Sequence, residues 1–167
     1  MNIIPYEPPM RQAALDLALR AWGPVFPQLK AAVPGFVYGA FYPEEWQKRQ
    51  LSDLGQILDN EPHTVDMAML QGQNGSEKPQ LAGWVCTRIH PEDSMGEVYI
   101  LAVDPQFQRR GIGHALMNHS HDRARAAGMT MMMVETGGDP GHTPARHTYE
   151  AAGYQRWPVA RYFKNLQ

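Results

Sequence analysis

Apolar side chains recur along the chain at spacings that predict helices and strands. Residues 10–22 and 44–58 place them three or four positions apart, which predicts two amphipathic helices. Residues 64–70, 80–90 and 96–103 read as strands, the first by its alternation of apolar and polar positions. The last of these strands is apolar from its third residue onward. This pattern predicts a central strand that is covered on both faces of a sheet.

The second half of the chain continues with helices and strands in alternation. A helix is predicted from about Arg110 to Ala127, with a glycine at the C-cap position and an apolar stripe. The stripe consists of Ile112, Ala115, Leu116, His119 and Ala127. The methionine-rich residues 129–135 predict a buried strand. A helix capped by the hydroxyl of Thr143 follows, and residues 154–163 predict a final strand or pair of strands. This order predicts an α/β fold with a mixed sheet.

Length, composition and charge narrow the class of protein. The 167 residues suffice for one domain, and a content of 43% hydrophobic residues excludes a disordered chain. Residues 71–79 predict a turn, and no interdomain linker is found. The net charge of −2 gives no general attraction to nucleic acid or to anionic membranes. No apolar stretch reaches the ~18 residues of a membrane span, and the N-terminus is unlike a signal peptide. Because Cys86 is the single cysteine, no internal disulfide forms, and we expect a soluble protein of the cytoplasm.

The segment 103–114, which joins the predicted central strand to the next helix, carries the clearest chemistry. No Ser, Thr, Asp or Asn stands next to the first turn of that helix, so its backbone N–H groups have no side-chain cap. Gly111 and Gly113 allow a ligand to approach the backbone closely, while Arg109 and Arg110 add positive charge. These features predict an anion site, for which a pyrophosphate is the natural occupant.

The same two glycines, in Gly111-Ile112-Gly113, also match the beginning of a dinucleotide-binding fingerprint. Glu135 then stands where such folds place a ribose-binding acid. However, Leu116 replaces the third glycine of the fingerprint, and residues 104–110 separate the glycines from the strand. A Rossmann-type dinucleotide-binding protein is therefore a remote alternative.

Two motifs resemble the signatures of the GNAT superfamily of acetyl-CoA-dependent N-acetyltransferases. Gln108-Arg109-Arg110-Gly111-Ile112-Gly113 matches the Gln/Arg-x-x-Gly-x-Gly/Ala signature, and the preceding Val103-Asp104-Pro105 resembles the family's strand exit. Farther along, the run from Ala145 to Tyr154 resembles the second signature, Ala-x-x-x-Tyr-x-x-x-Gly-Phe. The resemblance covers residues 80–164 well and the N-terminal part only by the order of its elements. It implies a mixed, mostly antiparallel sheet flanked by helices and splayed between its fourth and fifth strands, with the cofactor in the gap.

The resemblance also implies which residues bind acetyl-CoA as the acyl donor. These are Leu101, Ala102, Val103, Gln108, Arg109, Arg110, Gly111, Ile112, Gly113, His114, His142 and Tyr149. His142 departs from the family's pattern, which often has Asn at this position. We expect residues 1–167 to form one acetyltransferase-like domain. Its acceptor-side helices would span about 8–60, and its cofactor-binding core about 80–164.

Two residues are candidates for catalytic roles under this resemblance. Glu97 stands at the strand position where the histone-acetyltransferase branch of the family has a glutamate base, although a carboxylate at a strand end is usually only solvated. Glu135 is the rival carboxylate, and a surface position explains it equally well. Tyr149 lies on the inward face of its helix, where either core packing or a hydroxyl close to the cofactor sulfur accounts for it. Cys86 has no neighbour in the sequence that would activate a thiolate.

The histidines do not predict a metal site. His119 and His121 point to different sides of their helix, and no cluster of Cys and His has the spacing of zinc ligands. The many aromatic residues between Trp22 and Trp46 also call for an explanation. Packing in the core explains some of them, and the others, together with Trp157, Arg161 and Tyr162, are predicted to line a substrate pocket.

The sequence thus predicts an N-acetyltransferase that moves an acetyl group directly from acetyl-CoA to a primary amine of a small molecule or peptide. A non-catalytic acyl-CoA-binding sensor, or an inactive homologue, is the alternative, because a fold does not dictate an activity. No nucleic acid or membrane partner is expected, and a homodimer is compatible with the sequence. The identity of the acceptor amine stays open.

Overall fold

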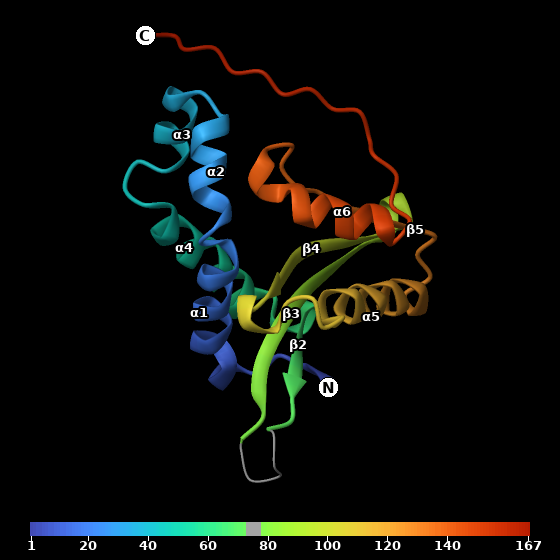
Figure 1. The fold of residues 1–167 in the computed structure, drawn as a ribbon. Coiled ribbons are helices and arrows are strands. Elements are labelled where there is room, and N and C mark those ends of the chain that lie inside the picture. Colours follow the sequence, from blue (N-terminus) through green and yellow to red (C-terminus); the bar gives the residue numbers. More distant parts are fainter. Residues whose placement is uncertain (73–77) are drawn as a thin grey trace.

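The structure is a computed structural model that describes residues 1–72 and 78–167. Its strands are β1 Asn2–Pro5, β2 Val65–Leu70, β3 Gln80–His90, β4 Met95–Val103 and β5 Met131–Val134. Its helices are α1 Arg11–Trp22, α2 Val25–Ala32, α3 Gly35–Phe41, α4 Trp46–Asn60, α5 Ile112–Ala126 and α6 Thr143–Ala151 (Figure 1). The turn predicted for residues 71–79 lies largely outside the described residues.

The five strands form one sheet in the order β1-β2-β3-β4-β5. Neighbouring strands are antiparallel from β1 to β4, whereas β4 and β5 are parallel. This confirms the mixed, mostly antiparallel sheet. A dinucleotide-binding fold would need a parallel sheet, so that alternative is wrong. Strand β1 was not predicted, because its four residues are too few to show a period.

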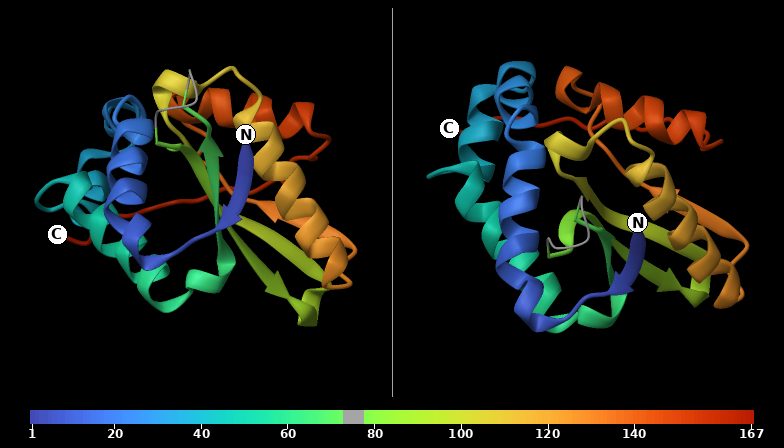
Figure 2. Two further views of the ribbon diagram at one scale, coloured as in Figure 1. Left: turned by 90° about the horizontal axis from the view of Figure 1, so that it is seen from below. Right: turned by 60° about the horizontal axis from the view of Figure 1, so that its bottom comes forward.

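Two hydrophobic cores lie on opposite faces of the sheet. The first core joins α1 and α4 to β2 and β3, with fully buried Trp84 donating from Nε1 to the carbonyl of Ala14 at 3.1 Å. The second core lies under α5, where Ile112 and Leu116 meet Val85 and Val98 of the sheet. Figure 2 shows the N-terminal helices on one side of the sheet and α5 on the other. The helices thus bury their apolar sides against the two faces of the sheet.

The sheet opens between β4 and β5. Only Met95–Val98 of β4 pair with β5, so residues 99–103 have no strand neighbour on that side among the described residues. On the other side, β3 pairs Cys86 with Ile100 and Thr87 with Val98, which leaves Tyr99 as an extra residue. Such a bulge bends a strand and re-aims its side chains. The expected splay between the fourth and fifth strands is therefore present.

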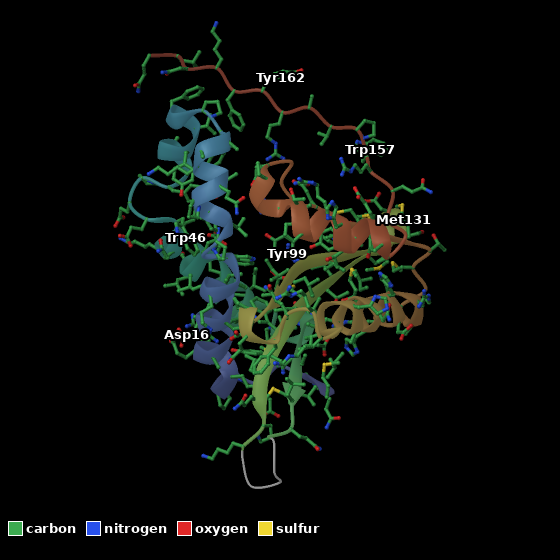
Figure 3. All side chains as sticks on the ribbon, in the orientation of Figure 1. Asp16, Trp46, Tyr99, Met131, Trp157 and Tyr162 are labelled. Carbon is green, nitrogen blue, oxygen red and sulfur yellow. The ribbon has the colours of Figure 1, made fainter. Side chains whose placement is uncertain are left out.

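The last part of the chain differs from the prediction. Residues 154–163 form no strand; they leave α6 and cross toward α3 as an extended segment (Figure 1). Phe163 meets Phe41 edge to face, with ring centroids 5.9 Å apart. Figure 3 shows Trp157 and Tyr162 on this segment, apart from the sheet, and Trp157 is 85% exposed. Aromatic and apolar residues give a segment the capacity for a strand, but a strand also needs a hydrogen-bonded neighbour.

Smaller differences concern burial and caps. β4 is not covered along its whole length, because Tyr99 at the bulge is 42% exposed. Met131 in β5 is exposed as well, since it stands at the open edge of the sheet. In α5 the buried positions include Met117 and Ser120, whereas Ala127 lies beyond the helix and is exposed. The predicted cap at Thr143 is absent, because this hydroxyl accepts a hydrogen bond from Arg146 instead.

Prolines shape the connections between these elements. Each 3-10 turn in the described part of the chain begins with proline, whose fixed φ suits the first position of a helical turn. The proline-rich residues 23–43, for which no structure was predicted, fold into α2 and α3. Among the described residues, no helix combines the length and the apolar character that crossing a membrane would require.

Candidate functional site

The loop that follows β4 is fixed from below by a buried aspartate. Asp104 is 2% exposed, and its carboxylate accepts from the backbone N–H of Gln106 at 3.1 Å. Its second oxygen receives Arg20 Nη2 from α1 at 2.6 Å. A buried carboxylate needs such donors, and here they tie the loop to an N-terminal helix. Sequence reasoning missed this pair because the two residues lie far apart in the chain.

The N-terminus of α5 has the properties that the sequence predicted. Gly111 stands at the N-cap with φ +80°, a left-handed conformation that favours glycine, and no side chain caps the helix. A Cβ at Gly111 would meet nothing within 4 Å, and one at Gly113 would meet only Val103 Cγ2, at 3.6 Å. The backbone N–H groups of the first turn are therefore open to a ligand. This arrangement fits a phosphate group.

The polar side chains around this turn are mostly exposed. Arg109 adopts φ +60°, and the guanidinium of Arg110 lies 5.5 Å from the centre of the Phe107 ring. Gln108 donates from Nε2 to the carbonyl of Val103 at 3.2 Å, which ties the loop back to the end of β4. His114 lies on the exposed side of α5. Positive charge thus surrounds the helix N-terminus, where an anion would bind.

The open part of β4 leads directly into this loop. Leu101 and Val103 pack against the core under α5, whereas Ala102 belongs to the core of α1 and α4. The segment 99–103 is free of β5 and ends at the uncapped helix. A ligand with a phosphate group at one end and an extended arm would therefore fit from the α5 N-terminus into the gap of the sheet. Coenzyme A has this shape, so the residues present fit it.

Glu97 lies farther back in β4, on the face that α1 and α4 cover. It is the cross-strand partner of Arg88, whose side chain on the same face reaches Glu61 at the end of α4. The Glu97 side chain is 13% exposed, and its Oε2 lies 2.8 Å from His90 Nε2. The carboxylate is therefore held by a named partner and is not simply solvated. Sequence reasoning did not identify His90.

Arg88 and Tyr99 form the wall next to Glu97. Arg88 donates two hydrogen bonds to Glu61, at 2.9 and 2.8 Å, and these bonds hold the pKa of the Glu61 carboxyl below its ordinary value. The Arg88 guanidinium also lies 3.4 Å from the centre of the Tyr99 ring. The ring of the bulge residue is thus fixed by a cation on the strand beside it. Alternating polar residues at the end of β3 are the only sequence signal of this cluster.

Tyr149 lies in α6 with a half-buried side chain, and its helix runs above β4 and β5 in Figure 1. Burial raises the pKa of its hydroxyl above the ordinary value of 10.0. Tyr154 lies beside it, with ring centroids 6.1 Å apart, and Tyr154 Oη lies 2.8 Å from His121 Nε2. The Tyr149 hydroxyl therefore stays protonated at neutral pH, as a proton donor must.

The loop before α6 is held by Asp139. Its carboxylate accepts from the backbone N–H of Gly141 at 2.9 Å and lies 2.5 Å from His142 Nδ1. Arg146 donates to the carbonyls of Gly137 and Asp139, at 2.6 and 2.8 Å. His142 is thus fixed at the start of α6. The contact with Asp139 is therefore made by a histidine at the position where the family's pattern often has Asn.

Several other sequence candidates lie away from the open part of β4. Glu135 is exposed and pairs with Arg161 at 3.3 Å, so it lies at the surface. Cys86 is fully buried, and burial raises the pKa of its thiol. Among residues 1–72 and 78–167, no group of three or more His, Cys, Asp or Glu side chains could hold a metal ion. Trp157 and Tyr162 are exposed on the extended segment that follows α6, and their place in an acceptor pocket stays a prediction.

The aromatic residues of the N-terminal helices form a cluster of their own. Phe26 is buried and stacks on Trp46 with ring centroids 4.1 Å apart, while Tyr42 meets Phe26 edge to face at 5.3 Å. Phe36 and Phe41 are exposed. Part of this set therefore packs α2, α3 and α4 together, and the exposed members remain candidates for contact with an acceptor.

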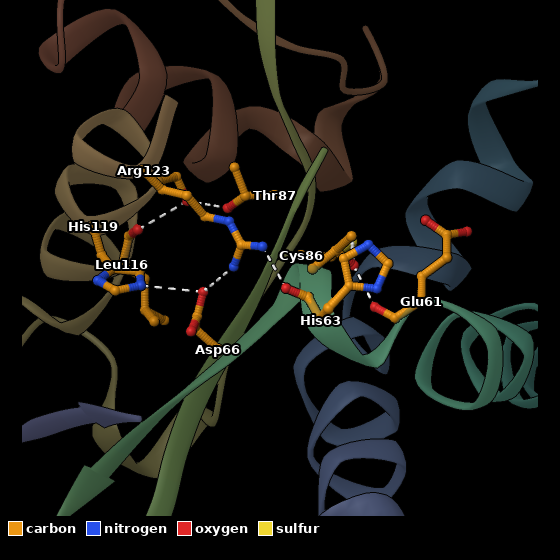
Figure 4. A network of polar contacts seen from close by, with 10 residues as sticks. Glu61, His63, Asp66, Cys86, Thr87, Leu116, His119 and Arg123 are labelled. Atoms are coloured by element: carbon orange, nitrogen blue, oxygen red, sulfur yellow. Dashed lines mark hydrogen bonds and ion pairs between the residues drawn. The ribbon is translucent and has the colours of Figure 1, made fainter. Parts of the chain in front are cut away.

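A second polar network lies on the opposite face of the sheet (Figure 4). The buried Asp66 of β2 lies 3.0 Å from Arg123 Nη1 and 3.1 Å from His119 Nε2, both from α5. Thr87 donates to Ser120 at 2.8 Å, and Ser120 donates to the carbonyl of Leu116. These contacts join α5 to the sheet through satisfied polar groups. They explain why His119 is part of the inner side of α5 without being a metal ligand.

Comparisons with known proteins agree with this geometry. The model of the Acetyltransferase (GNAT) family matches residues 36–154. A mycothiol acetyltransferase of Rhodococcus jostii (strain RHA1) is 30% identical over 124 residues, which cover 71% of this chain and 39% of that relative. A mycothiol acetyltransferase of Thermomonospora curvata is 37% identical over 84 residues, which cover 48% and 26%. The chain thus spans well under half of the length of these curated relatives.

Solved structures show the same fold at low sequence identity. An aminoglycoside antibiotic 6'-N-acetyltransferase from Acinetobacter haemolyticus has a TM-score of 0.62 at 14% identity, covering 99% of this chain and 98% of its own. A GNAT-family protein from Desulfovibrio desulfuricans, described as a putative acetyltransferase, has a TM-score of 0.61 at 18% identity, covering 95% and 87%. An N-acetyltransferase from Thermoplasma acidophilum, with a TM-score of 0.57 at 11% identity, was solved in complex with coenzyme A; the match covers 90% and 87%.

Proposed function

We infer an activity from the premise that this chain belongs to the acetyltransferase (GNAT) family. The activity that we propose is direct transfer of the acetyl group of acetyl-CoA to a primary amine of a small molecule or peptide. One observation carries the proposal: β4 separates from β5 after Val98 and leads into an uncapped helix N-terminus. This geometry supports a ligand that is anionic at one end and extended along a strand at the other.

The binding part of the proposal assigns roles along β4 and its loop. The first-turn N–H groups of α5 bind the pyrophosphate of acetyl-CoA, with Gly111 and Gly113 permitting close approach and Arg109 and Arg110 adding charge. Residues 101–103 offer backbone groups along the arm of the cofactor. Acetyl-CoA supplies an activated acyl group as a thioester. We also assign to the cofactor site His142, the N-cap residue of α6, and Tyr149 within α6.

The catalytic part begins with the acceptor amine. An alkyl amine has an ordinary pKa near ~10.4, so it is protonated at neutral pH and must lose a proton before it attacks. Glu97 accepts this proton, directly or through a water molecule. Its carboxylate is nearly buried, and one oxygen is engaged by His90 while the other is available. A positioned base of this kind contributes on the order of 10²-fold or more to the rate.

The next steps concern the acyl carbon and the leaving thiolate. A backbone N–H near Leu101 to Val103 stabilises the oxyanion, a contribution of about 3 kcal/mol in comparable sites. The Tyr149 hydroxyl then gives its proton to the departing thiolate, whose conjugate acid has an ordinary pKa of ~8.5. Because Cys86 is buried and its thiol pKa is raised, transfer proceeds without an acyl-cysteine.

Further properties belong to the same proposal. Residues 1–167 act as one acetyltransferase unit, with the helices of about 8–60 on the acceptor side and residues of about 80–164 binding the cofactor. We propose the cytoplasm as its location. A peptide is an acceptor that the proposal includes beside small molecules, and a homodimer is the assembly that it includes beside the monomer. The relatives bear the names of mycothiol and aminoglycoside acetyltransferases. These names favour a small polar amine as the first acceptor to test.

The test is release of the free CoA thiol when the protein meets acetyl-CoA and a panel of amines: an aminosugar thiol, an aminoglycoside, a polyamine and a peptide. We expect turnover with at least one of them, and Glu97→Gln should lower kcat on the order of 10²-fold. Glu135→Gln is the matched control, because this rival carboxylate is exposed and should leave kcat unchanged. Binding of acetyl-CoA without turnover of any amine would favour the sensor instead. Loss of activity in the Glu135 variant alone would move the base to that residue.

A further inference from the structure

The contact between His90 and Glu97 joins two strands diagonally. β3 pairs Arg88 with Glu97 and His90 with Met95, so His90 lies two residues from the partner of Glu97 and on the same face of the sheet. His90 Nε2 lies 2.8 Å from Glu97 Oε2. Diagonal neighbours in an antiparallel pair are close enough for long side chains to touch. The contact is therefore set by the register of the sheet.

Burial makes this contact important for the carboxylate. Glu97 is largely withdrawn from water, and a carboxylate in such a position needs a hydrogen-bond donor. Among the described residues, the Glu97 side chain has His90 as its hydrogen-bond partner. The bond occupies Oε2 and leaves Oε1 for a further ligand. It also selects one rotamer of a side chain that would otherwise have several.

The other charged groups nearby do not replace His90. Arg88, the cross-strand neighbour of Glu97, is engaged by Glu61 through two hydrogen bonds and lies over the Tyr99 ring. Glu92 Oε1 lies 3.7 Å from His90 Nδ1, and the Glu92 side chain is 69% exposed. The His90 ring thus stands between Glu97 and a solvated carboxylate. His90 also lines a depression of about 400 Å³, together with Glu61, His63, Arg88 and Arg123.

We propose that His90 is the positioning residue for Glu97: its Nε2–H donates to Oε2 and fixes the carboxylate so that Oε1 faces the acceptor amine. The proposal deepens the proposed function and rests on it, because it takes Glu97 as the base. His90 itself touches no reacting atom. A base that is held in one rotamer stays in the position that the reaction needs. A displacement of about 1 Å in such a group can lower the reaction rate on the order of 10²-fold.

The first test reads the hydrogen bond without any assay of activity. Nitrogen NMR spectra of the histidine side chains distinguish the Nε2–H from the Nδ1–H tautomer, and a His90→Gln variant assigns the signal. We expect the Nε2–H tautomer for neutral His90 in the unaltered protein and a mixture of tautomers in Glu97→Leu, which lacks the acceptor. A predominant Nδ1–H tautomer in the unaltered protein would overturn the proposal.

The second test separates positioning from a merely structural role. With acetyl-CoA and the amine that gives turnover, His90→Ala should lower kcat at least about tenfold while KM for acetyl-CoA stays the same. His90→Gln keeps a donor on a side chain of similar reach and should restore most of the activity. His63→Ala is the matched control, because this histidine lines the same depression without contacting Glu97.

The outcomes distinguish this inference from the proposed function. An inactive Glu97→Gln together with a fully active His90→Ala would remove the positioning role and leave the base in place. Equal loss in His90→Ala and His90→Gln, with equal loss of thermal stability, would show that the histidine is only a structural part of the strand pair. If no amine is acetylated, the proposed function fails, and the tautomer measurement still decides whether His90 donates to Glu97.

Discussion

The two halves of the site are built from different materials. The N-terminus of α5 presents backbone groups, shaped by Gly111 and Gly113 within a few consecutive residues. The cluster of Arg88, His90 and Glu97 presents side chains, brought together by the pairing of β3 with β4 and by a link to Glu61. The first half depends on the absence of side chains, the second on their exact partners. A single side chain added at a glycine should therefore abolish cofactor binding at the α5 N-terminus. Substitutions in the cluster of Arg88, His90 and Glu97 should instead lower the activity by graded amounts.

The largest effect is expected where the backbone must stay bare. Gly113→Val places a branched side chain beside Val103, in a space that the protein leaves open, so the fold should tolerate it while the cofactor's phosphates are blocked. We expect the rise in melting temperature on adding acetyl-CoA to disappear. Gly39→Val is the control, because an added Cβ at this glycine of α3 meets nothing within 4 Å and the residue lies outside the α5 N-terminus. An undiminished shift in the Gly113 variant would contradict the phosphate site.

The next effect concerns Tyr149 of α6, a further side chain whose role depends on its exact position. Tyr149→Phe keeps the ring and deletes only the hydroxyl, whose pKa burial raises, so that the donor is protonated throughout the neutral range. A general acid should lose on the order of 10²-fold in kcat with unchanged affinity for acetyl-CoA. A structural tyrosine would lose about 1 kcal/mol of stability with turnover nearly intact. Steady-state kinetics together with thermal unfolding separate the two cases.

A smaller effect tests whether charge or backbone dominates at the α5 N-terminus. Arg109 and Arg110 are exposed, so their attraction for phosphate is screened by salt. Replacing both with Ala should weaken acetyl-CoA binding by no more than about tenfold at low salt, with less difference at high salt. Calorimetric titrations at two ionic strengths measure this. Binding that is unchanged in affinity and in salt response would make the arginines ordinary surface residues.

The smallest effect is expected for the ion pair that supports the side-chain half. Arg88 lowers the pKa of Glu61, so this pair stabilises the fold above the ordinary carboxyl pKa of ~4.3, and the contribution is lost as pH falls through the lowered value. Glu61→Gln should lose less than about 1 kcal/mol at neutral pH, since both side chains are partly exposed. The difference from the unaltered protein should shrink as the pH falls from neutral through the lowered pKa of Glu61. A series of denaturant unfolding curves at falling pH tests the sign.

The same division explains what the sequence could and could not predict. The helix start at Gly111, its missing cap and its positive charge are properties of neighbouring residues, so they were predicted and are present. The pairing of His90 with Glu97 depends on strand register, and a one-residue bulge at Tyr99 changes which side chains share a face. A single sequence carries no local signal for that register. Asp104 and Arg20 were missed for the same reason.

The wrong strand prediction at residues 154–163 has a related cause. The residue types of a segment describe at most one partner of a ladder, whereas a strand exists only where a second partner lies beside it. Here the segment meets Phe41 through Phe163 and Glu135 through Arg161. The short β1 shows the converse case. Its four residues carry little pattern, and pairing with β2 makes them a strand.

The central claim is direct acetyl transfer from acetyl-CoA to an amine. The most direct measurement follows an isotope label placed in the acetyl group of acetyl-CoA, after incubation with the protein and the amine panel. The account predicts that the label appears on the nitrogen of at least one amine, that no label remains on the protein, and that Glu97→Gln slows its appearance. Label retained on the protein would contradict direct transfer. Label that stays on CoA with every amine would contradict the acetyltransferase activity itself.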